Sequence, residues 1–191
     1  MPYVIQVDAI ALAGNMFTAG CYNAVGPTAA LSEAAAAQTF TATKPTLLFI
    51  NPAGSGYNCY LTNLELFQTG TVAGARPNIM MAYDSGNRYS SGAAARYPVN
   101  KMAGGRTSAV SLYQGQNASL VTATAATAFV KYFTGRDFLQ TVTAVNEIAA
   151  QTFDFCGSVV IPPGFTFLVY LIANTTGMTY AWNLDWFERN P

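Results

Sequence analysis

Residues 157–189 read GSVVIPPGFTFLVYLIANTTGMTYAWNLDWFER and contain the clearest structural pattern of the chain. Within them, Phe165 to Ala173 is almost continuously apolar, which is typical of a strand buried on both faces. After a short linker the hydrophobicity alternates strictly, so the apolar side chains share one face of a half-buried strand. These side chains are Met178, Tyr180, Trp182, Leu184 and Trp186, and they include both tryptophans of the chain. We therefore expect a final hairpin that closes the core, with Tyr180, Trp182, Leu184 and Trp186 as core anchors.

Further strand-like runs, separated by turn residues, precede this stretch. The first two, Thr46 to Asn51 and Tyr57 to Gln68, flank a short loop and are predicted to pair as a hairpin. The others are Asn78 to Asp84, Thr107 to Tyr113, Ser119 to Ala123, Phe129 to Thr134, Phe138 to Val145, Thr152 to Phe155 and Val159 to Ile161. Many short strands without a long helix predict an all-β protein. The expected fold is a two-sheet antiparallel β-sandwich of jelly-roll type, with an immunoglobulin-like sandwich as the alternative.

Residues 1–36 differ from the rest of the chain. They are rich in Ala, carry few charges and show only a weak strand pattern. A segment of this kind is ordered mainly by what it contacts, because it has little apolar surface of its own to bury. We expect an N-terminal arm over residues 1–36 and the sandwich domain over residues 37–191, with core strands beginning near Phe40.

The 191-residue chain is poor in charge. Nine basic residues balance nine acidic ones, and charged residues make up 9% of the chain, against roughly 25% in typical soluble domains. Balanced charge does not favour binding to nucleic acid or to an anionic membrane, and no stretch reaches the ~20 apolar residues of a membrane span. So few charges favour a surface partly covered by other chains, with a neutral polar surface as the alternative.

The chain has no histidine, which removes the commonest general base and the commonest metal ligand. Its three cysteines, Cys21, Cys59 and Cys156, show no CxxC spacing, so no zinc site and no cofactor is predicted. Cys59 and Cys156 lie in apolar strand-like runs and are expected to be buried free thiols. Free thiols are compatible with assembly in a reducing cytoplasm.

Several carboxylates could form the pair that a glycosidase needs, although turn-forming and solvated carboxylates are commoner. They are Glu65, Asp84, Asp137, Asp154, Asp185 and Glu188. The glycosylation sequons at Asn117 and Asn174 are expected to provide turn chemistry, and Gly54-Ser55-Gly56 is expected to be a turn because it lacks the lysine of a phosphate-binding loop.

The segment from Arg88 to Arg106 is predicted to be a Gly-, Ala- and Ser-rich loop. It carries four basic residues and no acidic one. They are Arg88, Arg96, Lys101 and Arg106. A loop of this charge is either a docking loop for an acidic partner surface or a solvated loop, and the sequence favours neither.

Two segments together resemble a known group of proteins. They are TKPTLLFINPAGSGYNCYLTNLEL (43–66) and IPPGFTFLVYLIANTTGMTYAWNLDWFE (161–188). Both are similar to segments of jelly-roll head decoration (cement) proteins, or related head-fibre virion proteins, of tailed bacteriophages. In those proteins a Lys-Pro, apolar strand, Asn-Pro-x-Gly-Ser-Gly segment opens the sandwich, and a Pro-Pro-Gly to Asp-Trp-Phe/Tyr-Glu segment closes it. The resemblance does not cover the first 36 residues or the middle of the chain.

The resemblance implies a non-enzymatic structural protein of a virion, assembled in the host cytoplasm. Its expected partners are the capsid protein, whose outer surface it would bind and stabilise, and copies of itself in a homotrimer; nucleic acid and membrane are not expected partners. The first alternative is a receptor- or glycan-binding module of a head or tail fibre, which would need exposed aromatic residues on loops. Two further alternatives are a secreted trimeric ligand of the C1q or tumour-necrosis type and a hydrolase with a convergent carboxylate pair.

Overall fold

The computed structural model describes residues 10–11, 13–21, 28–29, 31–32, 45–70, 77–87, 89, 94–115, 130–137, 150–173 and 179–191. Among these, only Ile10 and Ala11 have helical backbone, and the elements are strands. They are β1 (Met16–Cys21), β2 (Thr28–Ala29), β3 (Leu31–Ser32), β4 (Leu47–Ile50), β5 (Asn58–Gly70), β6 (Pro77–Asp84), β7 (Ala94–Arg96), β8 (Val99–Asn100), β9 (Ser111–Gln114), β10 (Val130–Asp137), β11 (Ala150–Ile161), β12 (Thr166–Ala173) and β13 (Thr179–Arg189).

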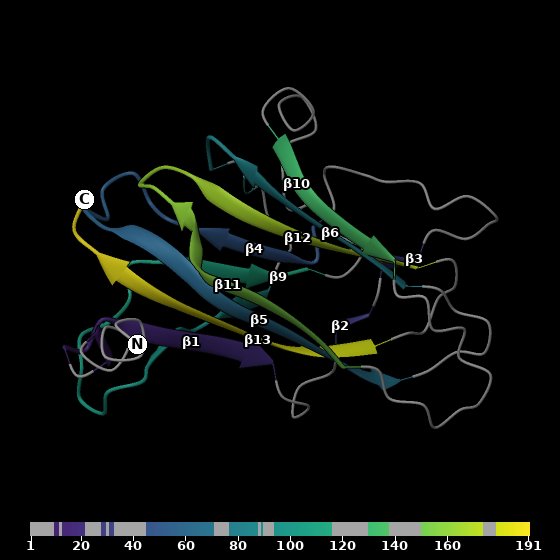
Figure 1. Ribbon diagram of the computed structural model, residues 1–191, viewed down its shortest axis with the longest axis horizontal. Coiled ribbons are helices and arrows are strands. Elements are labelled where there is room, and N and C mark those ends of the chain that lie inside the picture. Colours follow the sequence, from purple (N-terminus) through teal and green to yellow (C-terminus); the bar gives the residue numbers. More distant parts are fainter. Residues whose placement is uncertain are drawn as a thin grey trace.

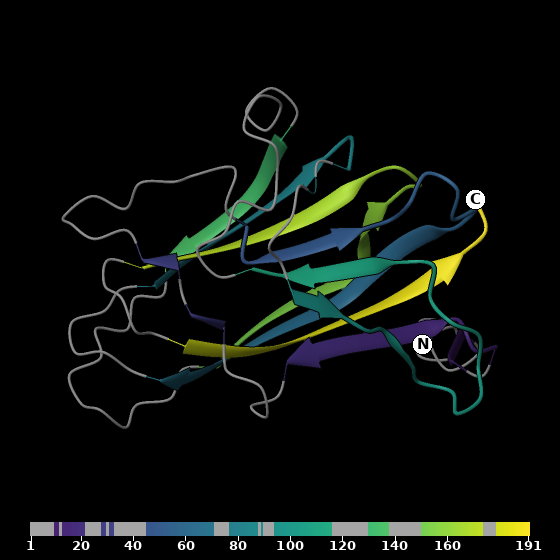
Figure 2. The ribbon, with the colours of Figure 1, turned by 180° about the vertical axis from the view of Figure 1, so that it is seen from behind.

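The strands form two sheets that pack face to face (Figures 1 and 2). Sheet A has the order β11-β5-β13-β1-β8, with β2 also paired to β13. Sheet B has the order β10-β6-β12-β4-β9-β7, with the two-residue β3 paired in parallel to β12. All other pairs are antiparallel. The predicted all-β, two-sheet antiparallel sandwich is confirmed.

Both predicted hairpins are wrong, although their strands exist. β12 lies in sheet B and β13 in sheet A, and β4 and β5 are divided in the same way. Each of these connections therefore crosses from one layer of the sandwich to the other. Hydrophobic periodicity reports which face of a strand is buried, and it does not report which strand lies beside it.

The prediction of an arm over residues 1–36 is wrong for β1. This strand pairs along its whole length with β13, from Met16 opposite Phe187 to Cys21 opposite Trp182. Phe17 is completely buried in the core, so core strands begin well before Phe40. The pattern was weak because the other inward positions of β1 are the small residues Ala19 and Cys21.

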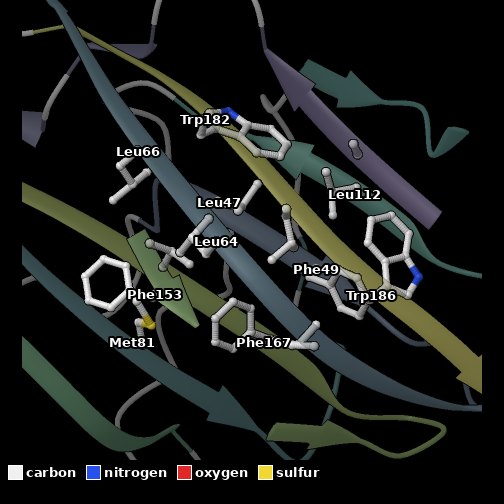
Figure 3. Packing of buried hydrophobic residues seen from close by; sticks show 14 of the residues in the cluster. Leu47, Phe49, Leu64, Leu66, Met81, Leu112, Phe153, Phe167, Trp182 and Trp186 are labelled. Carbon is white, nitrogen blue, oxygen red and sulfur yellow. The ribbon is translucent and has the colours of Figure 1, made fainter. Parts of the chain in front are cut away.

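The main core lies between the two sheets, and the four expected anchors lie in it. Tyr180, Trp182, Leu184 and Trp186 are each at most 2% exposed. Figure 3 shows the two indole rings pointing from β13 toward Leu47, Phe49 and Leu112 of sheet B. Phe49 meets the Trp186 ring edge-on, with 5.1 Å between the ring centroids.

Strand β12 is buried on both faces, as its continuous apolar sequence predicts. Phe167 and Val169 enter the main core, whereas Leu168 and Tyr170 join a second cluster on the other face of sheet B. The remaining buried members of that cluster are Leu48, Ile50 and Ala82, and Met80, Tyr89 and Tyr113 pack against it.

At one end of the sandwich, Asn51 connects two turns of the chain through hydrogen bonds, and it is completely buried. Its side-chain Nδ2 donates to the carbonyl oxygens of Tyr57 (2.7 Å) and Ile161 (2.8 Å). Its backbone N–H donates to the carbonyl of Phe165, and its carbonyl accepts from the N–H of Gly164. Gly164 has φ +86°, which a glycine adopts without strain, and it lies in the turn between β11 and β12.

Candidate interaction surface

The predicted basic loop closes one lateral edge of the sandwich. Its strand β7 pairs with β9 of sheet B, and its strand β8 pairs with β1 of sheet A only a few residues later. The chain thus passes from one sheet to the other along this edge (Figure 2, teal). We call residues 94–106 the edge segment.

Basic side chains of the edge segment bind groups of the same chain. Arg96 Nε donates to Gln114 Oε1 at 3.0 Å. Lys101 Nζ lies 2.7 Å from Asp185 Oδ2, and Arg106 forms an ion pair with Glu188. Arg88 lies outside the described residues. Lys101 and Arg106 are thus neutralised within the chain, whereas Arg96 meets a neutral amide and keeps its charge, so the docking of an acidic partner on this loop stays a prediction.

Glu188 is the most heavily hydrogen-bonded carboxylate of the described residues, and its side chain is completely buried. It accepts hydrogen bonds from Ser108 Oγ, from Arg106 Nη1 (2.7 Å), from the backbone N–H of Ala109 (3.2 Å) and from Trp186 Nε1 (3.3 Å). A buried charge is tolerated only when it is paired and hydrogen-bonded in this way.

The partner of Glu188, Arg106, is partly exposed and also contacts two aromatic rings and Asn15. Its guanidinium carbon lies 4.3 Å from the ring centre of Tyr57 and 4.9 Å from that of Phe17, and its Nε donates to Asn15 Oδ1 at 3.0 Å. Cation–π contacts and the ion pair together tie the edge segment to β1 and β13.

Asn100 fixes the path of the edge segment between these ion pairs. Its Nδ2 donates at 2.8 Å to the carbonyls of Gly14 and Arg106, and its Oδ1 accepts from the N–H of Met102 at 2.9 Å. The N–H of Lys101 adds a hydrogen bond to the Met16 carbonyl. The backbone is therefore preorganised although it lacks long strands.

Three large apolar side chains project from this fixed backbone into solvent. Tyr97 is 83% exposed, Val99 60% and Met102 43%. We call these three residues the edge patch. Tyrosine and methionine are enriched at protein interfaces, and apolar groups on a preorganised loop bind partners at a low entropic cost.

The outer face of sheet A carries a second apolar surface. Four cross-strand neighbours lie in one row: Val160 of β11 is opposite Tyr60 of β5, Tyr60 is opposite Phe187 of β13, and Phe187 is opposite Met16 of β1. Val160 is 40% exposed, and the other three are partly exposed. Tyr60 and Phe187 stack with 4.7 Å between their ring centroids. We call these four residues the apolar row.

A polar ladder lies beside the apolar row on the same face. Thr18 Oγ1 donates to Asn183 Oδ1 at 2.9 Å, Asn183 Nδ2 donates to Asp185 Oδ1 at 3.4 Å, and Lys101 binds the other oxygen of Asp185. The charges on this part of the sheet are thus neutralised within the molecule.

In the described part of the chain, no group of three acidic or cysteine ligands that could hold a metal ion is found. Asp185 and Glu188 are each engaged with a cation, as described above. Asp84 is buried and accepts from the N–H of Gly86, and Asp154 accepts from the N–H of Cys156. The side chain of Asp137 and the sequons at Asn117 and Asn174 lie outside the described residues.

The cysteines divide into two kinds. None of the three forms a disulfide. Cys59 is completely buried, and burial, with a smaller contribution from the nearby Glu188, raises the pKa of its thiol far above the usual value. The prediction that Cys156 is buried is wrong. It lies exposed in a β-bulge of β11, with φ +49°, where the register against β5 shifts between Asp154 and Val159.

Comparison with known proteins assigns no family to the chain. No family model matches it, and no curated protein is significantly similar to it. In the described ranges, no helix has the length and apolar character needed to cross a membrane. The edge patch and the apolar row are the surfaces that the residues offer, and sequence patterns alone did not single out either of them.

Proposed function

We infer that the sandwich is of jelly-roll type. Eight strands carry the inference: β1, β4, β5, β6, β10, β11, β12 and β13. Numbered one to eight in this order, they lie as 1-8-3-6 in sheet A and as 2-7-4-5 in sheet B. Successive strands thus alternate between sheets except at β6 and β10, and this winding supports a double Greek key.

We propose that the protein is a structural component of a bacteriophage particle. It binds the outer capsid surface as an oligomer, most simply a homotrimer, and stabilises the shell. One observation carries the proposal: the two segments that resemble decoration proteins meet in space. Asn51 of the first segment is hydrogen-bonded to Ile161, Gly164 and Phe165 of the second.

The same two segments also meet along their strands. β5 pairs with β13 over most of its length, and β4 pairs with β12. Segments separated by about a hundred residues thus form one continuous unit, which supports a resemblance to one fold rather than two unrelated matches. The low charge of the chain and the internal pairing of Lys101 and Arg106 fit a protein whose surface is covered in an assembly.

The test is re-addition of purified protein to capsids assembled without it, followed by pelleting. We expect saturable co-pelleting and a capsid that resists heating better with the protein bound. Failure of the folded protein to pellet with any such capsid would remove the proposal.

A receptor- or glycan-binding module is the second candidate, because Tyr97 offers an aromatic ring that is 83% exposed on a fixed loop. This candidate predicts binding to a bacterial surface glycan that is lost in Tyr97→Ala, without binding to capsids.

A further inference from the structure

We propose that Arg96 binds a carboxylate of a partner protein, and that the edge patch packs on apolar groups that surround this carboxylate. The inference deepens the proposed function and rests on it, because the partner is the capsid protein to which the chain binds there. It names the chemistry of the contact, which is one acidic side chain flanked by apolar ones.

Arg96 is oriented by a buried amide. Its Nε donates at 3.0 Å to Oε1 of Gln114, and the same oxygen accepts at 2.9 Å from Nε1 of Trp182. Gln114 is 7% exposed and Trp182 is 2% exposed, so this acceptor is anchored in the core of the sandwich. Because a guanidinium is planar, the bond through Nε limits the directions in which its two terminal nitrogens point. Little ordering of Arg96 remains to be done when a ligand binds.

The terminal nitrogens of Arg96 are open to solvent. In the described part of the chain Arg96 forms no ion pair, and its terminal nitrogens have no hydrogen-bond partner and are not buried. Arg106, the other arginine of the edge segment, differs on both counts, since it pairs with Glu188 and its Nη2 is buried. Two parallel N–H groups of a guanidinium match the two oxygens of a carboxylate. Arg96 thus keeps a bidentate binding edge that the chain itself does not use.

Apolar side chains adjoin this charge. Tyr97 follows Arg96 directly and is 83% exposed, and Val99 is 60% exposed. Asn100 fixes the backbone beside them through its bonds to the carbonyls of Gly14 and Arg106. Arginine and tyrosine contribute most to the affinity of protein interfaces, where apolar neighbours exclude water from the contact.

Charge complementarity favours a protein carboxylate as the group that Arg96 binds. A nucleic acid is held through several phosphates and therefore requires several unpaired cations. Lys101 and Arg106 are paired with acidic side chains, which leaves Arg96 as the one unpaired cation of residues 94–106. A single cation among apolar groups is complementary to a single acidic side chain among apolar groups.

Nuclear magnetic resonance tests the site without any capsid. The probe is sodium acetate, added to the full chain at an ionic strength kept constant with sodium chloride, and the signal is the Nε–H cross-peak of each arginine. We expect a saturable shift of the Arg96 cross-peak. Arg189, an exposed arginine at the end of β13, is the internal reference and should shift less. Equal, unsaturable shifts of the two cross-peaks would overturn the proposal.

Charge reversal measures the contribution of Arg96 to capsid binding in the pelleting assay. Arg96→Glu should weaken binding at least about tenfold, as the loss of an interface arginine does. Arg189→Glu is the matched control, because it makes the same change in net charge at an exposed arginine. Equal effects would assign the binding to net charge, and unaltered binding of Arg96→Glu would show that no carboxylate is held there; either result contradicts the site. Circular dichroism establishes that both variants fold.

Gln114→Glu tests the open charge while Arg96 stays in place. The substitution keeps the oxygen that accepts from Trp182 and Arg96, and it places a negative charge beside the guanidinium. Arg96 is then paired within the chain, as Arg106 already is. Capsid binding should fall at least about tenfold, and the acetate-dependent shift of Arg96 should shrink. A folded Gln114→Glu variant with the binding of the original protein would contradict the role of the open charge.

The inference and the proposed function fail separately. A saturable acetate shift at Arg96 in a protein that pellets with no capsid would retain the carboxylate site and discard the capsid as partner. Capsid binding that Arg96→Glu leaves unaltered would retain the function and discard this contact. Tighter binding to alginate, a carboxylated polysaccharide, than to capsids would assign Arg96 to a glycan and overturn the protein partner.

Discussion

The two lateral edges of the sandwich end in different ways. At one edge, β7 and β8 join the two sheets, and side chains from β13 hold the connecting segment through the Lys101–Asp185 and Arg106–Glu188 pairs. At the other, sheet A ends on the long strand β11, whose bulge contains two residues of positive φ, Cys156 and Gly157. The first edge is closed by long-range electrostatics, whereas the second is made irregular by local backbone geometry, which hinders pairing with another strand.

The largest expected effect is at the closed edge. Deleting residues 2–36 removes β1, to which β8 pairs and which covers one side of β13. Phe17 is lost from the core and the Arg106 side chain loses a ring contact, so the protein should not fold. Circular dichroism and thermal unfolding measure this, and deletion of residues 2–9, which keeps β1, is the control. A cooperative unfolding transition in the longer deletion would show that β1 is dispensable.

Removal of the buried carboxylate should weaken the same edge without abolishing the fold. Glu188→Ala leaves the Arg106 guanidinium without its counterion, and we expect a loss of about 3 kcal/mol in the free energy of unfolding, at the low end for broken buried pairs because Arg106 is partly exposed. Urea denaturation measures it. Lys101→Ala, which breaks the more exposed pair, is the control and should cost about 1 kcal/mol or less. Equal losses in the free energy of unfolding for Glu188→Ala and Lys101→Ala would mean that the burial of Glu188 does not strengthen its ion pair.

The bulged edge should respond to backbone geometry rather than to charge. Gly157 has φ +74°, and a Cβ there would lie 3.3 Å from Cε1 of Phe187. Gly157→Ala should therefore cost about 1–2 kcal/mol, the penalty for a left-handed conformation in a residue with a side chain. The control is Ser158→Ala in the same bulge, which removes the hydrogen bond from Ser158 Oγ to the Phe155 carbonyl. Chemical denaturation of both variants distinguishes backbone strain from the loss of a hydrogen bond. An unchanged midpoint for Gly157→Ala would indicate that the bulge readily adopts another conformation.

The smallest perturbation is thiol labelling, which leaves the sequence intact. In native buffer at pH 8, the exposed Cys156 should be labelled well before the buried Cys59, which should react only after denaturation. Cys59 is buried, and burial raises the pKa of its thiol, so the reactive thiolate is scarce at that pH. Mass spectrometry of the labelled peptides distinguishes the sites. Rapid native labelling of Cys59 would place it at the surface.

The strands with a strong apolar pattern and the core were predictable because they depend on local periodicity. The alternation of β13 places both tryptophans in the core, and the apolar sequence of β12 predicts burial on both faces. β1 was missed because alternation that relies on Ala19 and Cys21 carries a weak apolar signal. The strand partners were missed because pairing between sheets depends on the whole topology.

The candidate interaction surface was less accessible to prediction. The sequence shows four cations between residues 88 and 106, but it does not show that two of their partners, Asp185 and Glu188, lie more than 80 residues away. Nor does the sequence show that Cys59 is buried whereas Cys156 is exposed, since a bulge turns Cys156 outward within an otherwise strand-like run. Exposure of Tyr97 follows from the path of the edge segment, which these distant contacts determine.

The pairing of β1 with β13 has a consequence for the timing of biosynthesis. Thr18 and its hydrogen-bonding partner Asn183 are separated by 165 residues, so the ribosome must make nearly the whole chain before β1 has its neighbour. During that time Phe17 lacks its place beside Trp186, and long-range strand pairing is intrinsically slow. Because β8 pairs with β1, it cannot reach its final position before β1 does. The edge segment, which β13 holds through Asp185 and Glu188, therefore reaches its final conformation only after β13 has been made.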